Sequence, residues 1–169
     1  YLNEVRGKAL ELGCTAYHQR LRSGYLRNLI IRYSSANDEF MVVLLTSQPE
    51  LECDFRLAEW FLKDFAENNP KCTSVIHAVN STVSPVANGE IAGYTGNPFI
   101  REKILGVEYK ISPFSFFQTN FSQLDPFIDE IIKSSEVKPT DIVWDLYCGA
   151  GSITLPCSKH CSKIYGIEL

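Results

Sequence analysis

The octapeptide DLYCGAGS, residues 145–152, is the most informative stretch of this chain. It begins inside an apolar segment, residues 142–146, that is typical of a buried strand, and it leads into a short segment of helical character. Glycines in such a turn let the backbone approach a ligand, and the N-terminus of the following helix offers unpaired N–H groups. A second apolar segment, residues 163–167, ends at Glu168. This order predicts a βαβ unit whose acid accepts hydrogen bonds from a ribose.

The residues of the turn discriminate between classes of nucleoside cofactor. The dinucleotide fingerprint G-x-G-x-x-G requires a third glycine where Thr154 stands, which disfavours NAD and FAD. Asp145 opens the turn with a negative charge. An acid at this position suits a cofactor with a cationic end better than one with a pyrophosphate, so we expect S-adenosylmethionine. The alternative is a tight strand-to-helix turn that binds no ligand.

The segment around this turn, residues 113–169, predicts the start of a parallel α/β domain. A helix is expected over residues 121–134, with Pro126 either kinking it or lying in its first turn. Strands 142–146 and 163–167 follow. Two parallel strands do not make a doubly wound sheet, which needs apolar cover on both faces. We therefore expect the chain to be a fragment of a longer protein.

Residues 1–112 predict a separate α+β domain of antiparallel strands with two helices. Gly13 stands where a first helix ends, and Asp54 is expected to be the N-cap of the second helix. The polar stretch 34–39 and the turn at Gly106 each join two strands as a hairpin. The expected elements are helices 2–12 and 54–67 and strands 25–33, 40–46, 73–79, 101–105 and 107–111.

Composition excludes several classes of protein. Hydrophobic residues make up 45% of the chain and charged residues 21%, which is typical of folded domains. Apolar runs are too short for a membrane span, and the first residues do not form a signal peptide, so we expect no membrane association. The 6 cysteines lack the spacing of a disulfide scaffold and are interpreted as reduced thiols. We expect an intracellular protein, most simply a cytoplasmic one, with the nucleus and organelles as alternatives.

Charge is distributed unevenly along the chain, although the net charge is only -4. Residues 17–33 carry no acid, whereas residues 34–70 carry eight acids against two bases. A cationic segment with interleaved tyrosines is typical of a surface that contacts RNA phosphates. The alternatives are solvated surface charges and internal pairing with acids of the 54–67 helix. The candidate RNA-binding residues are Arg20, Arg22, Arg27 and Arg32.

Two motifs in series resemble those of the RNA 5-methyluridine methyltransferase family. The segment SFFQTN, residues 115–120, is followed by a helix and then by DLYCGAGSITLP, residues 145–156. In that family an S-F-F-Q-x-N motif precedes a D-L-x-C-G-x-G cofactor loop at about this distance. The segments GYLRNLIIR, residues 24–32, and IREKILG, residues 100–106, also look like those of the family. The resemblance covers nearly the whole chain.

The resemblance implies a fold, a reaction and a set of site residues. It implies an α+β central domain, residues 1–112, followed by the start of a class I, Rossmann-like methyltransferase domain, residues 113–169. It implies transfer of a methyl group from S-adenosylmethionine to uridine C5 of tRNA or ribosomal RNA. Many bacterial members have Phe at the position of Tyr147 and Asn at that of Ser152. The cofactor site would comprise Gln118, Asp145, Tyr147, Gly149, Gly151, Ser152 and Glu168.

The resemblance also implies that the catalytic residues of the family lie outside this chain. The family's cysteine nucleophile and glutamate base lie downstream of the cofactor loop, so no catalytic residue is expected here and the chain by itself is expected to be inactive. Cys148 belongs to the loop and is not the nucleophile. Two alternatives stay open: a non-catalytic RNA-binding module with a vestigial cofactor loop, and a methyltransferase of another substrate class.

Cysteine spacing predicts no metal site. Cys157, His160 and Cys161 match no standard zinc pattern. Some members of the family bind an iron–sulfur cluster through closely spaced cysteines, but Cys14 and Cys53 are too far apart in the chain to repeat that motif, and so is Cys72. We therefore expect neither a metal ion nor an iron–sulfur cluster, and we predict no protein partner.

Overall fold

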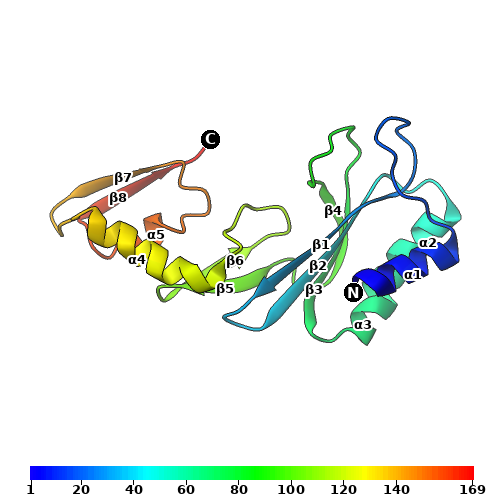
Figure 1. Ribbon diagram of the computed structural model, residues 1–169, viewed down its shortest axis with the longest axis horizontal. Helices are drawn as coiled ribbons and strands as arrows, with labels where there is room; N and C mark the ends of the chain where they lie inside the picture. The colour runs from blue at the N-terminus through cyan, green and yellow to red at the C-terminus, as the bar shows by residue number, and fades with distance from the viewer. The chain divides into compact units, whose positions relative to one another are not determined.

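A four-stranded sheet with the order β1-β2-β3-β4 organises the first part of the chain in the computed structural model, which describes residues 1–169 (Figure 1). The antiparallel hairpin predicted from the sequence is confirmed, with β1 at Leu26–Ser34 and β2 at Glu39–Thr46. The strand β3 at Cys72–Val79 lies beside β2, and β4 at Glu90–Gly96 forms the far edge. The strand β4 was not predicted, because its sequence EIAGYTG has two glycines and an alanine, which are depleted in strands.

The prediction of purely antiparallel strands in this part of the chain is wrong. Strands β2 and β3 pair in parallel, with Val43 opposite Ile76 and Leu45 opposite Ala78. The intervening helix carries the chain back along the sheet, as a parallel pair requires. The residues from Met41 to Leu45 are buried on both faces of the strand, and this unbroken apolar run is the pattern of a central parallel strand.

Two helical segments cover one face of this sheet (Figure 1). The first, α1 at Leu2–Leu12, ends as predicted at Gly13, which adopts a left-handed conformation with φ 79°. The second begins at Glu52 and is divided into α2 at Glu52–Trp60, a π-helical turn η1 at Phe61–Phe65 and α3 at Ala66–Asn68. Leu57, Phe61 and Phe65 are fully buried against the sheet.

The predicted N-cap of the second helix is corrected. Asp54 lies at the third helical position, and its Oδ2 atom accepts hydrogen bonds from the backbone N–H groups of Glu50 at 3.1 Å and Leu51 at 3.0 Å. An acid at this position reaches back to the amides that precede the helix, as in one half of a capping box. The residue type was therefore correctly associated with the helix start, but its register was wrong by three positions.

The second part of the chain contains two small sheets and a helix. The predicted hairpin is confirmed as β5 at Ile100–Ile104 and β6 at Val107–Ile111. A 3-10 turn η2 at Phe121–Gln123 leads into α4 at Leu124–Ser134, so that Pro126 lies in the first turn of the helix. The strands β7 at Ile142–Leu146 and β8 at Lys163–Ile167 pair in parallel around the short helix α5 at Thr154–Cys157. The chain thus has an α/β fold.

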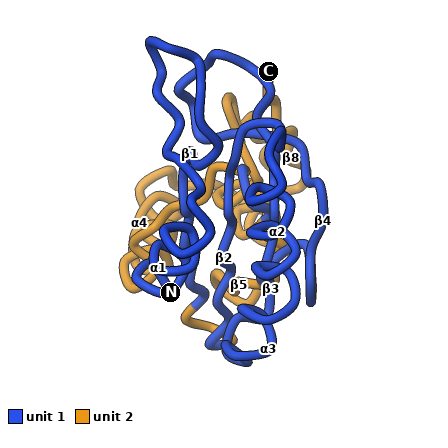
Figure 2. The backbone as a smooth tube through the Cα atoms, turned by 90° about the vertical axis from the view of Figure 1, so that its right-hand side faces the viewer, with its two compact units in different colours: residues 1–34, 38–100, 112–114 blue, residues 35–37, 101–111, 115–169 orange.

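The chain forms two compact units (Figure 2). Unit 1 comprises residues 1–34, 38–100 and 112–114, and unit 2 comprises residues 35–37, 101–111 and 115–169. The hairpin of β5 and β6, apart from Ile100, therefore belongs to unit 2, and the compact units do not follow the predicted domain boundary at residue 112. The division into functional domains stays a prediction. None of the helices is long and apolar enough to cross a membrane.

Candidate functional site

The glycine turn of unit 2 is held at the carboxyl end of two parallel strands. Strands β7 and β8 pair in register, with Asp145 opposite Gly166 and Leu146 opposite Ile167. Two further hydrogen bonds continue this pairing, because the Ile167 carbonyl accepts from the N–H groups of Tyr147 at 2.8 Å and Cys148 at 3.1 Å. The turn that follows β7 therefore lies beside the end of β8, where ligands of α/β sheets bind.

The backbone of the turn adopts an unusual conformation. Tyr147, Gly149 and Gly151 have φ values of 65°, 54° and 77°. Glycine tolerates this left-handed region, whereas for Tyr147 it is uncommon and strained. The Tyr147 side chain is 77% exposed. The N–H of Gly151 donates to the carbonyl of Cys148 at 2.8 Å, so the turn is closed by its own backbone hydrogen bond.

Glu168 stands at the end of the second parallel strand, as expected from the sequence, and its side chain reaches the glycine turn. The N–H of Gly149 donates a hydrogen bond to the Glu168 carboxylate, with 2.6 Å between N and Oε2. A carboxylate at the end of β8 is thereby held against the turn that follows β7. Since both groups are exposed, the arrangement brings a backbone turn and an acid together at the surface, where a ribose hydroxyl can be bound.

Asp145 has a structural partner that the sequence did not reveal. Its Oδ2 atom accepts a hydrogen bond from the hydroxyl of Thr154, the first residue of α5. Thr154 is buried and stands where the dinucleotide fingerprint has its third glycine. One carboxylate oxygen of Asp145 therefore ties the strand to the helix that follows the turn.

The hairpin of β5 and β6 also forms a hydrogen bond to the glycine turn. The hydroxyl of Tyr109 on β6 donates to the carbonyl of Gly151 at 3.2 Å, and burial raises the pKa of this phenol to about 12. The phenol therefore stays protonated as a donor at neutral pH. Sequence reasoning missed this residue, and the only available signal was the alternation of buried and exposed positions along 107–111.

Gln118 and Ser152, the remaining residues of the predicted cofactor site, differ in their surroundings. Ser152 is half-buried and directly follows the turn. Gln118 is exposed and lines a hollow of about 530 Å³ near the start of α4, together with Asn120 and Phe127. Residues of the glycine turn do not line this hollow. Among the neighbouring aromatics only Phe117 is buried, and it packs against Tyr109 with ring centroids 5.6 Å apart.

The four candidate RNA-binding arginines do not share one environment. Arg20 and Arg22 are exposed on the loop between α1 and β1, and Arg22 has φ 53°. Arg32 on β1 is half-buried, and this burial lowers the pKa of its guanidinium. Arg27 is used inside unit 1: its Nη1 donates to the Ser84 carbonyl at 3.0 Å, its Nη2 donates to the Thr82 carbonyl, and its guanidinium lies 4.0 Å from the ring centroid of Tyr17.

A polar hollow of about 480 Å³ lies at the carboxyl ends of β2 and β3 in unit 1. Arg22 and Arg27 both line it, and Tyr17 and Tyr25 contribute aromatic surface. Hydroxyl groups of Ser47 and of the loop after β3 also line it, as do the acids Glu50 and Asp54. The charges of this hollow are mixed, but its arginines, aromatic rings and hydroxyls are groups that contact single-stranded nucleic acid.

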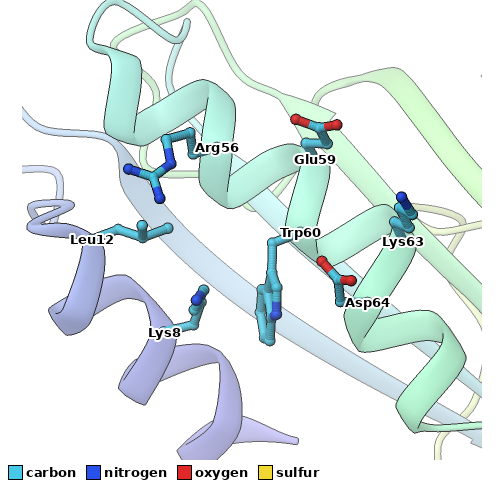
Figure 3. Close-up of a pocket in the computed structure, with 7 residues that line it drawn as sticks. All are labelled: Lys8, Leu12, Arg56, Glu59, Trp60, Lys63 and Asp64. Atoms are coloured by element: carbon cyan, nitrogen blue, oxygen red, sulfur yellow. The ribbon is translucent and has the colours of Figure 1, made fainter.

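A second hollow of unit 1, of about 280 Å³, lies between α1 and the second helix (Figure 3). The indole of Trp60 points toward α1, and Lys8 approaches the ring with Nζ 6.0 Å from its centroid. Arg56 and Lys63 add positive charge, but Glu59 and Asp64 lie on the same rim and Lys8 is paired with Glu11 at 2.7 Å. The charges are mixed, so we assign no ligand to this hollow.

Comparisons with known proteins relate the chain to RNA methyltransferases. No protein-family model matches it. An uncharacterized RNA methyltransferase of Chlorobaculum tepidum is 35% identical over 169 residues, which cover 99% of this chain and 34% of the relative. An uncharacterized RNA methyltransferase of Thermotoga maritima is 30% identical over 167 residues, covering 99% of this chain and 37% of the relative. The chain thus spans about a third of the length of these curated relatives.

A solved structure resembles the chain over most of its length. The tRNA (uracil-54, C5)-methyltransferase of Pyrococcus abyssi, in complex with S-adenosyl-L-homocysteine, superimposes with a TM-score of 0.75 and 25% sequence identity. The match covers 97% of this chain and 38% of that protein. The likeness therefore extends over both compact units.

Proposed function

Because this chain belongs to the RNA methyltransferase family, we propose that the protein containing it transfers a methyl group from S-adenosylmethionine to uridine C5 in RNA. The single observation that carries the proposal is the contact between Gly149 and Glu168, which joins a left-handed glycine turn to an acid at the end of the next parallel strand. A neighbouring structure that bears S-adenosyl-L-homocysteine, the product left after methyl transfer, supports the choice of cofactor.

Residues of unit 2 would bind different parts of the cofactor. Glu168 would accept hydrogen bonds from the ribose hydroxyls, and the backbone of Gly149 and Gly151 would allow close approach. Asp145 has one carboxylate oxygen bound to Thr154, so its other oxygen would face the cationic end of the cofactor. Tyr147 and Ser152 would complete the site. Gln118 would join it from the hollow at the start of α4, which the glycine turn does not line. When bound, S-adenosylmethionine supplies an electrophilic methyl group on a sulfonium.

The RNA would be bound by unit 1 at the polar hollow beside β2 and β3. The exposed Arg20 and Arg22 are suited to phosphate contacts. Arg27 would act differently, because its guanidinium already holds the loop after β3 and stacks on Tyr17. The half-buried Arg32 is the weakest of the four candidates. The cysteine nucleophile and the glutamate base implied by the resemblance would lie outside this chain.

The experiment incubates the full-length gene product with S-adenosylmethionine labelled on the methyl group and with tRNA or ribosomal RNA that lacks 5-methyluridine. Nucleosides are then separated and identified by mass spectrometry. We expect label in 5-methyluridine. RNA binding without methyl transfer would favour the non-catalytic module, and label in another nucleoside or in protein would favour a methyltransferase of another substrate class.

A further inference from the structure

Two cysteines and an aspartate converge where α1 ends and α2 begins. Cys14 directly follows the helix-terminating Gly13, and Cys53 and Asp54 lie in the first turn of α2. One ligand atom from each side chain, the two Sγ atoms and a carboxylate oxygen, all lie within 4.8 Å of one another. Cys14 and Asp54 are buried and Cys53 is half-buried. The sequence predicted no metal site here because Cys14 and Cys53 are 39 residues apart.

Hydrogen bonds orient the three groups. The Cys14 thiol donates to the backbone carbonyl of Cys53 at 3.2 Å, and the Cys53 thiol donates to Asp54 Oδ1 at 3.6 Å. The other oxygen, Asp54 Oδ2, accepts from the backbone N–H groups of Glu50 and Leu51. Backbone amides thus hold the carboxylate in place through one oxygen while the other faces a thiol. Outer hydrogen bonds of this kind orient the ligands of metal sites.

We propose that Cys14, Cys53 and Asp54 form a binding site for Zn²⁺ in unit 1. Two thiolates and a carboxylate are ligands that zinc accepts, whereas Mg²⁺ and Ca²⁺ prefer oxygen ligands alone. Two cysteines are too few to hold an iron–sulfur cluster with four thiolates. On binding, both S–H bonds break, two Zn–S bonds and one Zn–O bond form, and two protons pass to solvent. No atom is oxidised or reduced.

A four-coordinate ion requires the three ligand atoms to come closer together. Bonds of about 2.3 Å to sulfur and about 2.1 Å to oxygen separate the ligand atoms of a tetrahedral site by roughly 3.5 to 3.8 Å. The three groups therefore need to approach one another by about 1 Å from the upper limit of 4.8 Å. Cys53 is half-buried, and a water molecule would supply the fourth ligand. The ion would join the end of α1 to the start of α2.

The test uses the reduced chain of residues 1–169, loaded with ZnSO₄ and freed of excess metal by gel filtration. We expect one zinc ion per chain, a rise in Tm on adding zinc, and thiolate-to-metal absorption when Co²⁺ replaces Zn²⁺. Cys53→Ser should weaken zinc affinity at least tenfold and abolish the rise in Tm. Cys72→Ser is the matched control, since Cys72 is a buried cysteine of the same unit outside the cluster, and it should behave as the wild type.

Three results would overturn the proposal: a chain that retains no zinc, zinc that stays bound to the Cys53→Ser variant with unchanged affinity, or Co²⁺ that binds without thiolate absorption. Asp54→Asn provides a second variant, because an amide oxygen can still accept the backbone hydrogen bonds while the charge is removed. It should fold and bind zinc more weakly. If Asp54→Asn and Cys53→Ser both fold with wild-type zinc affinity, these residues are not ligands.

Discussion

The Glu168 carboxylate accepts one hydrogen bond from the Gly149 N–H at the end of the β7 and β8 pair. The proposed cofactor site depends most on this contact. The acid is exposed and does not contribute to a core. Its replacement therefore separates ligand binding from folding. By contrast, Asp145 and Thr154 are joined by a hydrogen bond that involves a buried side chain, so their replacement affects the stability of unit 2.

Glu168→Gln should weaken binding of S-adenosyl-L-homocysteine to the full-length protein by about tenfold to a hundredfold, because hydrogen bonds to a charged acceptor contribute about 1.5 to 3 kcal/mol. Isothermal titration calorimetry measures the affinity. Glu108→Gln, at an exposed acid on β6, is the control and should leave it unchanged. Equal affinities for Glu168→Gln and the wild type would remove Glu168 from the proposed site.

Thr154→Val should reduce the free energy of unfolding by about 1 to 3 kcal/mol, because a half-buried carboxylate oxygen of Asp145 loses its donor while the side-chain volume is kept. Urea denaturation followed by circular dichroism measures the change. Thr154→Ser retains the hydroxyl and should lose less stability than Thr154→Val. If the valine variant is as stable as the wild type, the hydrogen bond has no structural role.

His77 on β3 gives unit 1 a predictable dependence on pH. Its Nε2 atom contacts the hydroxyls of Tyr25 at 3.2 Å and Thr46 at 3.0 Å, and burial lowers the pKa of the imidazole below its ordinary value of 6.5. The unfolded chain therefore binds a proton more readily than the folded chain. The contribution of the neutral imidazole is complete above about pH 6.5 and is lost as the pH falls toward the lower folded pKa.

Stability of the wild type should therefore decrease between pH 7 and pH 5 more than that of His77→Gln, which has no titrating group at this position. Urea midpoints measured across this pH range for both proteins give the difference. Parallel pH profiles for the two proteins would show that His77 is protonated equally in the folded and unfolded states.

Arg27 connects two structural elements, the loop before β1 and the loop after β3. Its guanidinium donates to the carbonyls of Ser84 and Thr82 and stacks on Tyr17, so it joins segments that are more than 50 residues apart. Arg22 lines the same hollow but is exposed. Two arginines of one sequence cluster therefore have different roles, one in organising the loops and one at the surface.

Arg22→Gln should weaken RNA binding by the full-length protein and lower the slope of log affinity against log salt by roughly 0.7, the value for one phosphate contact on a single strand. Stability should be unchanged. Arg27→Gln should instead lower the thermal midpoint of unit 1, because its carbonyl contacts are lost. A salt titration of RNA binding and a thermal melt of each variant separate the two roles. An unchanged slope for Arg22→Gln would assign the RNA surface elsewhere.

Within the whole molecule, the two units differ in how much of the apolar surface of their sheets is buried. The central strands of unit 1 are buried on both faces, as the adjacent and fully buried Val42 and Val43 illustrate. In unit 2, Ile142 and Trp144 on β7 are 62% and 60% exposed. Since buried apolar surface is the main source of stability, the units should differ in resistance to denaturant.

The tryptophans report on the two units separately, because Trp60 lies in unit 1 and Trp144 in unit 2. In urea, the fluorescence transition of the Trp60→Phe variant, which retains Trp144, should occur at a lower midpoint than that of Trp144→Phe. Coincident midpoints would indicate a single cooperative transition for the whole chain.

The sequence by itself determined the local elements and the glycine turn. Helix 2–12, the hairpins and strands 142–146 and 163–167 follow from apolar periodicity and from glycines at fixed places, and these signals act between neighbouring residues. The position of Glu168 beside the turn was also predictable, since parallel strands bring their carboxyl ends to one edge.

Only the tertiary structure decided which distant residues meet. The parallel pairing of β2 and β3, the internal use of Arg27 and the convergence of Cys14 with Cys53 and Asp54 all join segments far apart in the chain. Local propensity does not say which segments pair or which residues meet across tens of positions, because the free energy that selects these contacts comes from burial in the assembled core. The role of an arginine or a cysteine was therefore set by its neighbours in space.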